Sequence, residues 1–166
     1  MKILKKEMLA VAVIDPAKKP GETGQYVRYK GNHLGLDAML ARARAEHFEI
    51  RRYVENMGSN GGTIPLKYVI TEVPPGHVQP FHSHENVDEI NLVRQGEMYF
   101  VESETLSEND REGIRAAGTL LREGDAVVSA RGKRHTVANL SDTYTHLIGT
   151  LSAASSAPSF EPDWKR

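Results

Sequence analysis

The sequence predicts an all-β fold, either a sandwich or a barrel, preceded by a short helical segment. From about residue 47 onward, apolar residues recur with the two-residue period of β-strands. Glycine, proline or acidic turn residues separate most of these short runs, and no long helical pattern follows. Many short strands without long helices are typical of an antiparallel sandwich or barrel.

The N-terminal part, residues 1–46, contains both strands and a helix. Short apolar stretches between turn residues predict one or two strands within residues 1–33. A helix is expected over residues 36–46, where Arg42 and Glu46 form an i,i+4 pair. Its apolar face consists of Leu36, Met39, Leu40 and Ala43. We expect this face to pack against the outside of the main core.

The remaining elements follow from the alternation and its interruptions. Segments 47–55 and 64–73 flank the turn-rich stretch 58–62, which predicts a hairpin. Further strands are expected at 78–84, 87–94, 97–102, 118–122, 125–130, 134–139 and 143–151. The polar segment 103–117 is predicted to be a loop or a short helical turn. We therefore divide the chain into N-terminal strands and helix packed on the barrel (1–46), a barrel (47–151), and a tail (152–166) that runs along the surface or onto a neighbouring subunit.

Composition limits the classes of function. A length of 166 residues suits one domain, and a net charge of −1 gives no electrostatic reason to expect nucleic acid or an anionic membrane as partner. Every apolar run is shorter than the roughly 20 residues that cross a bilayer. Because cysteine is absent, a metal would have to be held by nitrogen and oxygen ligands. We expect a soluble, cytoplasmic protein.

Four residues form a candidate metal-ligand set: His82, His84, Glu89 and His135. Strand geometry places His82 and His84, two positions apart, on the same face. Imidazole nitrogens with one carboxylate oxygen suit a divalent transition metal, namely iron, manganese, nickel, copper or zinc. Such a set leaves positions open on the metal, which is typical of a catalytic or ligand-sensing site. A structural zinc site with a filled tetrahedron is the alternative.

The residues around these ligands complete two motifs. The first has the spacing Gly76-x5-His82-x-His84-x4-Glu89-x6-Gly96, and the second Gly124-x5-Ala130-x-Gly132-x2-His135-x3-Asn139. In both, the chain resembles the cupin family, with one departure: Ala130 stands where the family usually has proline. The resemblance covers residues 47–151. It implies a jelly-roll β-barrel, a metal bound by the four residues above, and assembly as a homodimer.

Other residues are candidates for contact with a substrate. Asn91 shares the face of Glu89 and would contact a substrate or bond to a neighbouring strand. On the last predicted strand, His146 could reach the pocket as a general acid or base, and Tyr144 on the same face could donate a hydrogen bond. A structural role is the alternative for both. Arg51, Tyr53 and Tyr99 are candidates to orient an anionic or aromatic ligand, and Asn139 is expected to bond to backbone.

Three functions remain open for a cupin with this ligand set. The first is a metal-dependent oxygenase, similar to the quercetinase-like dioxygenase cupins, acting on a small oxygen-bearing organic substrate. In that scheme Glu89 is both a ligand and a base toward a substrate hydroxyl. The second is a non-redox isomerase or lyase in which the metal polarises a carbonyl. The third is a non-catalytic cupin that binds a small molecule.

Overall fold

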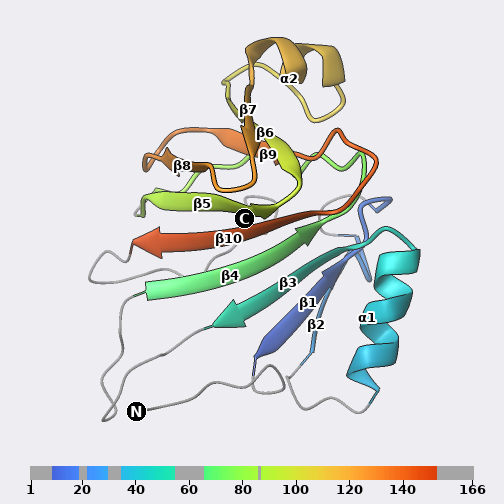
Figure 1. Ribbon diagram of the computed structural model, residues 1–166. Helices are drawn as coiled ribbons and strands as arrows, with labels where there is room; N and C mark the ends of the chain where they lie inside the picture. The colour runs from blue at the N-terminus through green and yellow to red at the C-terminus, as the bar shows by residue number, and fades with distance from the viewer. Residues whose placement is uncertain (1–8, 19–21, 30–34, 55–65, 86, 153–166) are drawn as a thin grey trace.

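The described residues form two antiparallel sheets and two short helices (Figure 1). The computed structural model describes residues 9–18, 22–29, 35–54, 66–85 and 87–152. The strands are β1 (Ala10–Ile14), β2 (Tyr26–Tyr29), β3 (Glu49–Val54), β4 (Leu66–Val73), β5 (Glu89–Gln95), β6 (Glu97–Glu102), β7 (Thr119–Arg122), β8 (Ala126–Ser129), β9 (His135–Ala138) and β10 (Thr145–Ser152). The helices are α1 (Leu36–Ala45) and α2 (Arg111–Ala117).

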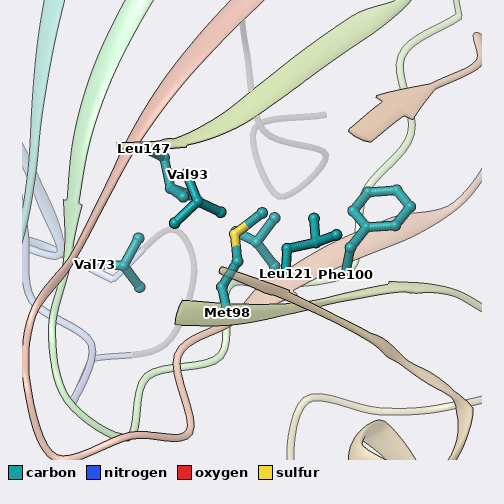
Figure 2. Close-up of a cluster of buried hydrophobic side chains, with 7 residues drawn as sticks. Val73, Val93, Met98, Phe100, Leu121 and Leu147 are labelled. Atoms are coloured by element: carbon teal, nitrogen blue, oxygen red, sulfur yellow. The ribbon is translucent and has the colours of Figure 1, made fainter. Parts of the chain in front are cut away.

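Seven strands form the larger sheet and three form the smaller one. Their orders are β2-β1-β3-β4-β10-β5-β8 and β7-β6-β9. Side chains from β4, β5 and β10 meet side chains from the smaller sheet in the main apolar cluster, as Figure 2 shows. The cluster consists of Val73, Val93, Met98, Phe100, Leu121, Val137 and Leu147. The all-β jelly-roll fold predicted from the sequence is confirmed.

The N-terminal strands enlarge one sheet rather than forming a separate layer. Strand β1 pairs with β3, and β2 pairs with the other edge of β1. Helix α1 lies against this end of the sheet (Figure 1), where Leu40 and Ala43 pack on Val11 and Ile50. Burial of these apolar side chains, at roughly 25 cal/mol per Å² of apolar surface, holds the helix in place. The expectation that the helix packs outside the main core is confirmed.

The turn between β5 and β6 requires a glycine. Gly96 alone separates the two strands and has a φ of 83°, a left-handed conformation that side chains disfavour. A Cβ there would also lie 3.0 Å from the Thr145 hydroxyl oxygen on β10. The turn at Gly96 therefore carries the chain from the larger sheet, which contains β5, to the smaller sheet, which contains β6, so the two strands do not form a hairpin.

Two sequence expectations are corrected or refined. Residues 78–84 do not form a continuous strand; isolated bridges at Val78 and His82 attach this segment to β9. Pro80 lies between them and has no N–H to donate to a ladder. Within 103–117, residues 111–117 form α2, which begins where the Asp110 carboxylate accepts a hydrogen bond from the Gly113 N–H at 2.9 Å.

Some expectations lie outside the described residues. The predicted turn at 58–62 and most of the tail, 153–166, belong to this group. In the part of the chain that the structure describes, no helix has the length and apolar character needed to span a membrane.

Candidate metal centre

Four side chains from three parts of the chain converge between the two sheets. Glu89 begins β5, His135 begins β9, and the bridged segment before β5 supplies His82 and His84. One potential ligand atom from each of the four lies within 4.8 Å of the others. The ring centroids of His82 lie 5.0 Å from His84 and 4.5 Å from His135. The structure therefore brings together all four residues predicted to bind metal.

Backbone pairing fixes this convergence. The His82 N–H donates to the His135 carbonyl at 2.9 Å, and the His135 N–H donates back to the His82 carbonyl at 2.8 Å. This antiparallel bridge places two residues 53 positions apart side by side, with their rings on the same side of the sheet. Glu89 faces the same interior because β5 alternates buried and exposed residues from its first position.

Two imidazoles are oriented by backbone carbonyls. The Nδ1 of His82 lies 2.9 Å from the Pro80 carbonyl oxygen, and the Nδ1 of His135 lies 2.9 Å from that of Lys133. A carbonyl oxygen only accepts, so each Nδ1 carries a proton and each Nε2 is the nitrogen that is left to bind a metal. The Ser129 hydroxyl, 2.9 Å from the same Nδ1 of His135, gives that ring a second neighbour. In metal-binding histidines, a hydrogen bond from the other ring nitrogen commonly fixes the tautomer and the orientation of the ring in this way.

The carboxylate of Glu89 faces the histidines with one oxygen. Its Oε2 lies 3.1 Å from His135 Nε2 and 3.3 Å from His84 Nε2. Burial by itself would raise the pKa of Glu89, but the hydrogen bonds from His135 and His84 outweigh burial and hold the pKa well below its usual range. Glu89 is therefore ionised, as a metal ligand must be.

The pKa values of His82 and His135 are shifted in opposite directions. Burial, reinforced by the nearby His135, lowers the pKa of His82 to about 4. His135 is also disfavoured as a cation by burial, but its hydrogen bond to Glu89 prevails and raises its pKa. The His82 imidazole is thus neutral at physiological pH, as a metal ligand must be. A cation entering the cluster has to displace the proton that Glu89 favours on His135.

The donor set fits a divalent transition metal. Three imidazoles and one carboxylate are nitrogen and oxygen ligands of intermediate softness, and their ligand atoms are close enough together to contact one ion. Both Glu89 and His135 are buried, with 8% and 1% of their surface exposed. A carboxylate at such a position is costly unless it is paired with a cation. His82, His84, Glu89 and His135 could therefore hold a metal.

A small cavity of about 20 Å³ lies beside this cluster. Asn91 and Gly149 line it together with apolar side chains of the main cluster. Gly149 makes this space possible, because a Cβ there would lie 3.2 Å from Asn91 Oδ1 and 3.6 Å from Glu89 Oε1. A cavity of this volume accommodates about one water-sized molecule. Asn91 is thus placed next to the cluster, as its alternation with Glu89 predicted.

A larger cavity of about 680 Å³ lies between the N-terminal elements and the barrel. Its walls include residues 14–18 at the end of β1, residues 46–49 and 51 around the start of β3, and residues 74–82. Three residues line both cavities: Arg51, Gln79 and His82. The volume lies in the range of small-molecule sites. The metal-ligand cluster therefore borders a space large enough for an organic molecule.

A buried polar network forms the boundary between the two cavities. Glu49, 1% exposed, accepts a hydrogen bond from Arg51 Nε at 2.5 Å and one from Gln79 Nε2 at 3.1 Å. His77 Nε2 lies 3.1 Å from the same carboxylate. Burial would raise the pKa of Glu49, but Arg51 and His77 together lower it to about 2. Among these residues, sequence reasoning singled out only Arg51; the alternation of Glu49, Arg51 and Tyr53 was the available signal.

Two residues predicted to reach the pocket lie elsewhere. The Tyr144 hydroxyl donates to the carbonyls of Arg44 and Phe48, each at 3.2 Å, at the C-terminal end of α1. His146 is paired with Glu72 across the sheet, whereas the adjacent Leu147 faces the interior and lines the small cavity. Since neighbours on a strand face opposite sides, His146 points away from the cluster. The structure thus places both side chains away from the four ligand residues, and the contacts of Tyr144 match the structural role that was its alternative.

The two tyrosines named as ligand-orienting candidates also have structural contacts. The hydroxyl of Tyr53 lies 3.1 Å from the hydroxyl of Tyr26 on β2, so Tyr53 joins the N-terminal hairpin to β3. Tyr99 packs on the cluster around Ile114 of α2. Arg51 is thus the member of that group whose position on the cavity walls matches the expectation.

Comparisons with known proteins agree with the sequence motifs. The family model described as "Cupin domain" matches residues 69–150. A comparison with curated proteins gives no match. Among solved structures, the chain is similar to a Cupin 2 conserved barrel domain protein from Salinispora arenicola CNS-205, with 22% identity, a TM-score of 0.48, and coverage of 63% of this chain and 77% of that chain.

Two further solved structures are similar at the same level. KdgF from Halomonas sp. has 20% identity and a TM-score of 0.46, over 64% of this chain and 81% of that chain. An oxalate oxidase has 19% identity and a TM-score of 0.49, over 63% of this chain and 51% of that chain. The match thus spans about half of the oxalate oxidase. The matched family model and the two motifs, whose metal-ligand positions meet in space, place the chain in the cupin superfamily.

Proposed function

We propose that this cupin is a metal-dependent oxygenase of the dioxygenase type, acting on a small oxygen-bearing organic substrate. His82, His84, Glu89 and His135 would bind one divalent transition metal. The observation that carries the proposal is the convergence of these four ligand atoms, within 4.8 Å of one another, next to two cavities of very different size.

The small cavity supports the oxygenase over the non-redox alternatives. Its volume of about 20 Å³ suits a water or a diatomic molecule such as dioxygen, and is too small for a sugar or a hydroxy acid. Val69, Val137 and Leu147 supply the apolar part of walls that are otherwise largely polar. The organic substrate would occupy the larger cavity, which reaches the cluster at His82.

Each group of residues around the proposed metal has a separate role in this reaction. A redox metal, when bound, would supply the one-electron chemistry that dioxygen requires. Glu89 is ionised, so its carboxylate can bind the ion. In the proposed reaction the same carboxylate also accepts the proton of a substrate hydroxyl. The backbone-anchored rings of His82 and His135 keep their Nε2 atoms in position. Apolar side chains around the small cavity keep bulk water out.

Metal analysis of variants tests the ligand set. Purified wild-type protein is expected to contain about one transition-metal ion per chain, and His84→Ala is expected to lose most of it, because one of four ligands is gone. His146→Ala is the matched control, since it also removes one imidazole but on the other face of the sheet. Elemental analysis by mass spectrometry measures both. Equal metal content in His84→Ala and His146→Ala would contradict the site.

Oxygen consumption tests the reaction class. With a metal-loaded enzyme and a library of small hydroxylated compounds, substrate-dependent oxygen uptake is expected, and it should disappear in His84→Ala. An oxygen electrode measures this directly. Turnover without oxygen uptake would instead assign the isomerase or lyase class, and ligand binding without turnover would assign a non-catalytic binding role.

A further inference from the structure

We propose that Arg51 binds the carboxylate group of the substrate at the wall shared by the two cavities, so that the substrate is a small carboxylic acid. This inference rests on the proposed function and names its substrate class. Arg51 belongs to β3, outside both metal-binding motifs, and lines both the small cavity and the larger one.

Pairing across the sheet explains how Arg51 comes to face the cluster. Arg51 lies opposite Thr71 of β4, and Thr71 lies opposite Leu147 of β10. Thr71 and Leu147 both line the small cavity, so Arg51 continues a row of inward-facing residues. Its side chain is 8% exposed. A long cationic side chain at such a position is rare unless it is paired.

The contact with Glu49 holds the guanidinium in a fixed place. Arg51 Nε donates to Glu49 Oε1 at 2.5 Å, and Gln79 binds the other oxygen of the same carboxylate at 3.1 Å. A guanidinium presents five N–H donors in a planar fork, and the printed contact with Glu49 is made by Nε. The same planar geometry matches a carboxylate in a bidentate pair.

The charges around the cluster favour an anionic ligand. Glu89 and Arg51 are the charged side chains lining the small cavity, and Glu49 compensates the charge of Arg51. A divalent ion held by Glu89 would therefore leave a net charge near +1 in a buried site. One carboxylate neutralises it, whereas a neutral ligand does not. A dianionic phosphate would leave an uncompensated negative charge.

The larger cavity has walls for the rest of such a molecule. Phe48, Val78 and Phe81 supply apolar surface on its walls. An organic acid with a short apolar or hydroxylated body therefore fits better than a highly charged compound. Binding its carboxylate at Arg51 would place that body on the side of the larger cavity, with its carboxylate end next to the metal ligands.

Calorimetric titration of the metal-loaded protein tests this assignment with matched pairs of ligands. Lactate and lactamide, and benzoate and benzamide, differ in charge but hardly in size. We expect each acid to bind at least about tenfold more tightly than its amide, because a hydrogen bond to a charged group is worth more than a neutral one. Inorganic phosphate is titrated as the competing anion and is expected to bind more weakly than either acid.

Variants of the buried pair identify the residue responsible. Arg51→Gln alone would strand Glu49, so the main variant is the double substitution Glu49→Gln and Arg51→Gln, which removes both charges together. Its affinity for the acids is expected to fall about ten- to hundredfold, with little change for the amides. Arg51→Lys keeps the charge but loses the fork, and should give an intermediate loss.

Arg52→Gln is the matched control. Arg52 is the next residue of β3, and its guanidinium pairs with Glu72 rather than facing the cavities. This variant should keep the wild-type preference for acids. Metal content and thermal melting are measured for every variant, so that a loss of binding is compared only among folded, metal-loaded proteins.

Three outcomes would overturn the assignment: no preference for the acid in either ligand pair, equal affinity for phosphate, or a double variant that binds the acids as the wild type does. Failure of the proposed function gives different results, namely wild-type protein without metal at the four ligands, or metal-loaded protein that takes up no oxygen with any substrate. A metal-loaded protein that binds the acids no more tightly than the amides would refute only the role of Arg51.

Discussion

The residues of the metal centre owe their positions to backbone neighbours. His82 and His135 are linked by a pair of main-chain hydrogen bonds, and each ring is held by a carbonyl two residues earlier in the chain. Glu89 is the one carboxylate among the four ligand residues. Its contacts with the histidine rings lower its pKa by more than burial raises it. Because these contacts exist within the protein itself, little rearrangement should accompany metal binding.

Gly149 provides a residue-scale test of the small cavity. In Gly149→Ala, the new methyl group would lie 3.2 Å from Asn91 Oδ1 and would occupy space now open beside Glu89. Metal content should remain near the wild-type level, because the four ligands are untouched. Affinity for a small exogenous ligand such as azide, followed by visible spectroscopy of the metal-loaded protein, is expected to fall by about tenfold or more.

Gly118 supplies the matched substitution for that experiment. It follows α2, does not line either cavity, and also has close neighbours. Gly118→Ala should therefore affect stability without affecting azide affinity in the folded fraction. Unchanged azide binding in Gly149→Ala would show that the cavity is not the site of small-ligand binding.

At the scale of elements, α1 depends on the outer face of the sheet. Leu40 is 5% exposed and packs with Val11, Ala43 and Ile50. Leu40→Ala is expected to lower the free energy of unfolding by about 2–5 kcal/mol, since it leaves a cavity among buried side chains. Urea denaturation measures the change. Arg42→Ala, on the exposed face of the same helix, should leave the midpoint nearly unchanged.

Helices and strands were predicted correctly from the sequence where a clear hydrophobic period or a family motif marked them. The helix over 36–46 and most of the strands from β3 onward followed from periodicity. Asn139 bonds to backbone carbonyls of Val73, Pro74 and Thr143, as expected for its motif position. The segment 78–84 was harder, because alternation suggested a strand but Pro80 interrupts the ladder.

The misplaced residues have a physical explanation. His146 was a candidate for the pocket because it lies on the last predicted strand, but its position on a strand does not say which face of that strand is buried. In the structure the register with β5 also shifts between His146 and Leu147. The network around Glu49 was missed for a related reason: charged residues alternating along a strand usually face solvent. Here Arg51 and Glu49 face the interior and compensate each other.

At the scale of the whole molecule, stability should depend on buried carboxylates. The pKa of Glu49 is lowered to about 2 and that of Glu89 is lowered as well, so both release their protons more readily in the folded state. Groups of this kind contribute stability that is complete above their unfolded value, about 4.5, and is lost as pH falls through the folded value.

Acid denaturation of metal-free protein measures this effect. The free energy of unfolding is expected to fall as pH decreases from about 4.5 toward 2, by about 1.4 kcal/mol per pH unit for each such carboxylate. The Glu49→Gln, Arg51→Gln double variant should show a slope smaller by about one proton. Identical slopes in the two proteins would mean that Glu49 is not ionised in the folded state.

The whole arrangement brings the two cupin motifs and an N-terminal extension to one place. The motifs supply the four ligands, whereas β3, which pairs with the N-terminal β1, supplies Arg51 and the start of the larger cavity wall. The chemistry proposed for the metal thus comes from one part of the sequence, and the proposed choice of substrate from another.

Anomalous X-ray diffraction from crystals of the metal-loaded protein, collected at the absorption edge of the bound metal, tests the central claim most directly. We predict one strong peak per chain, about 2.0–2.2 Å from a nitrogen of each of the three histidines and from a carboxylate oxygen of Glu89. A stoichiometric metal whose anomalous peak lies away from these four side chains would contradict the account.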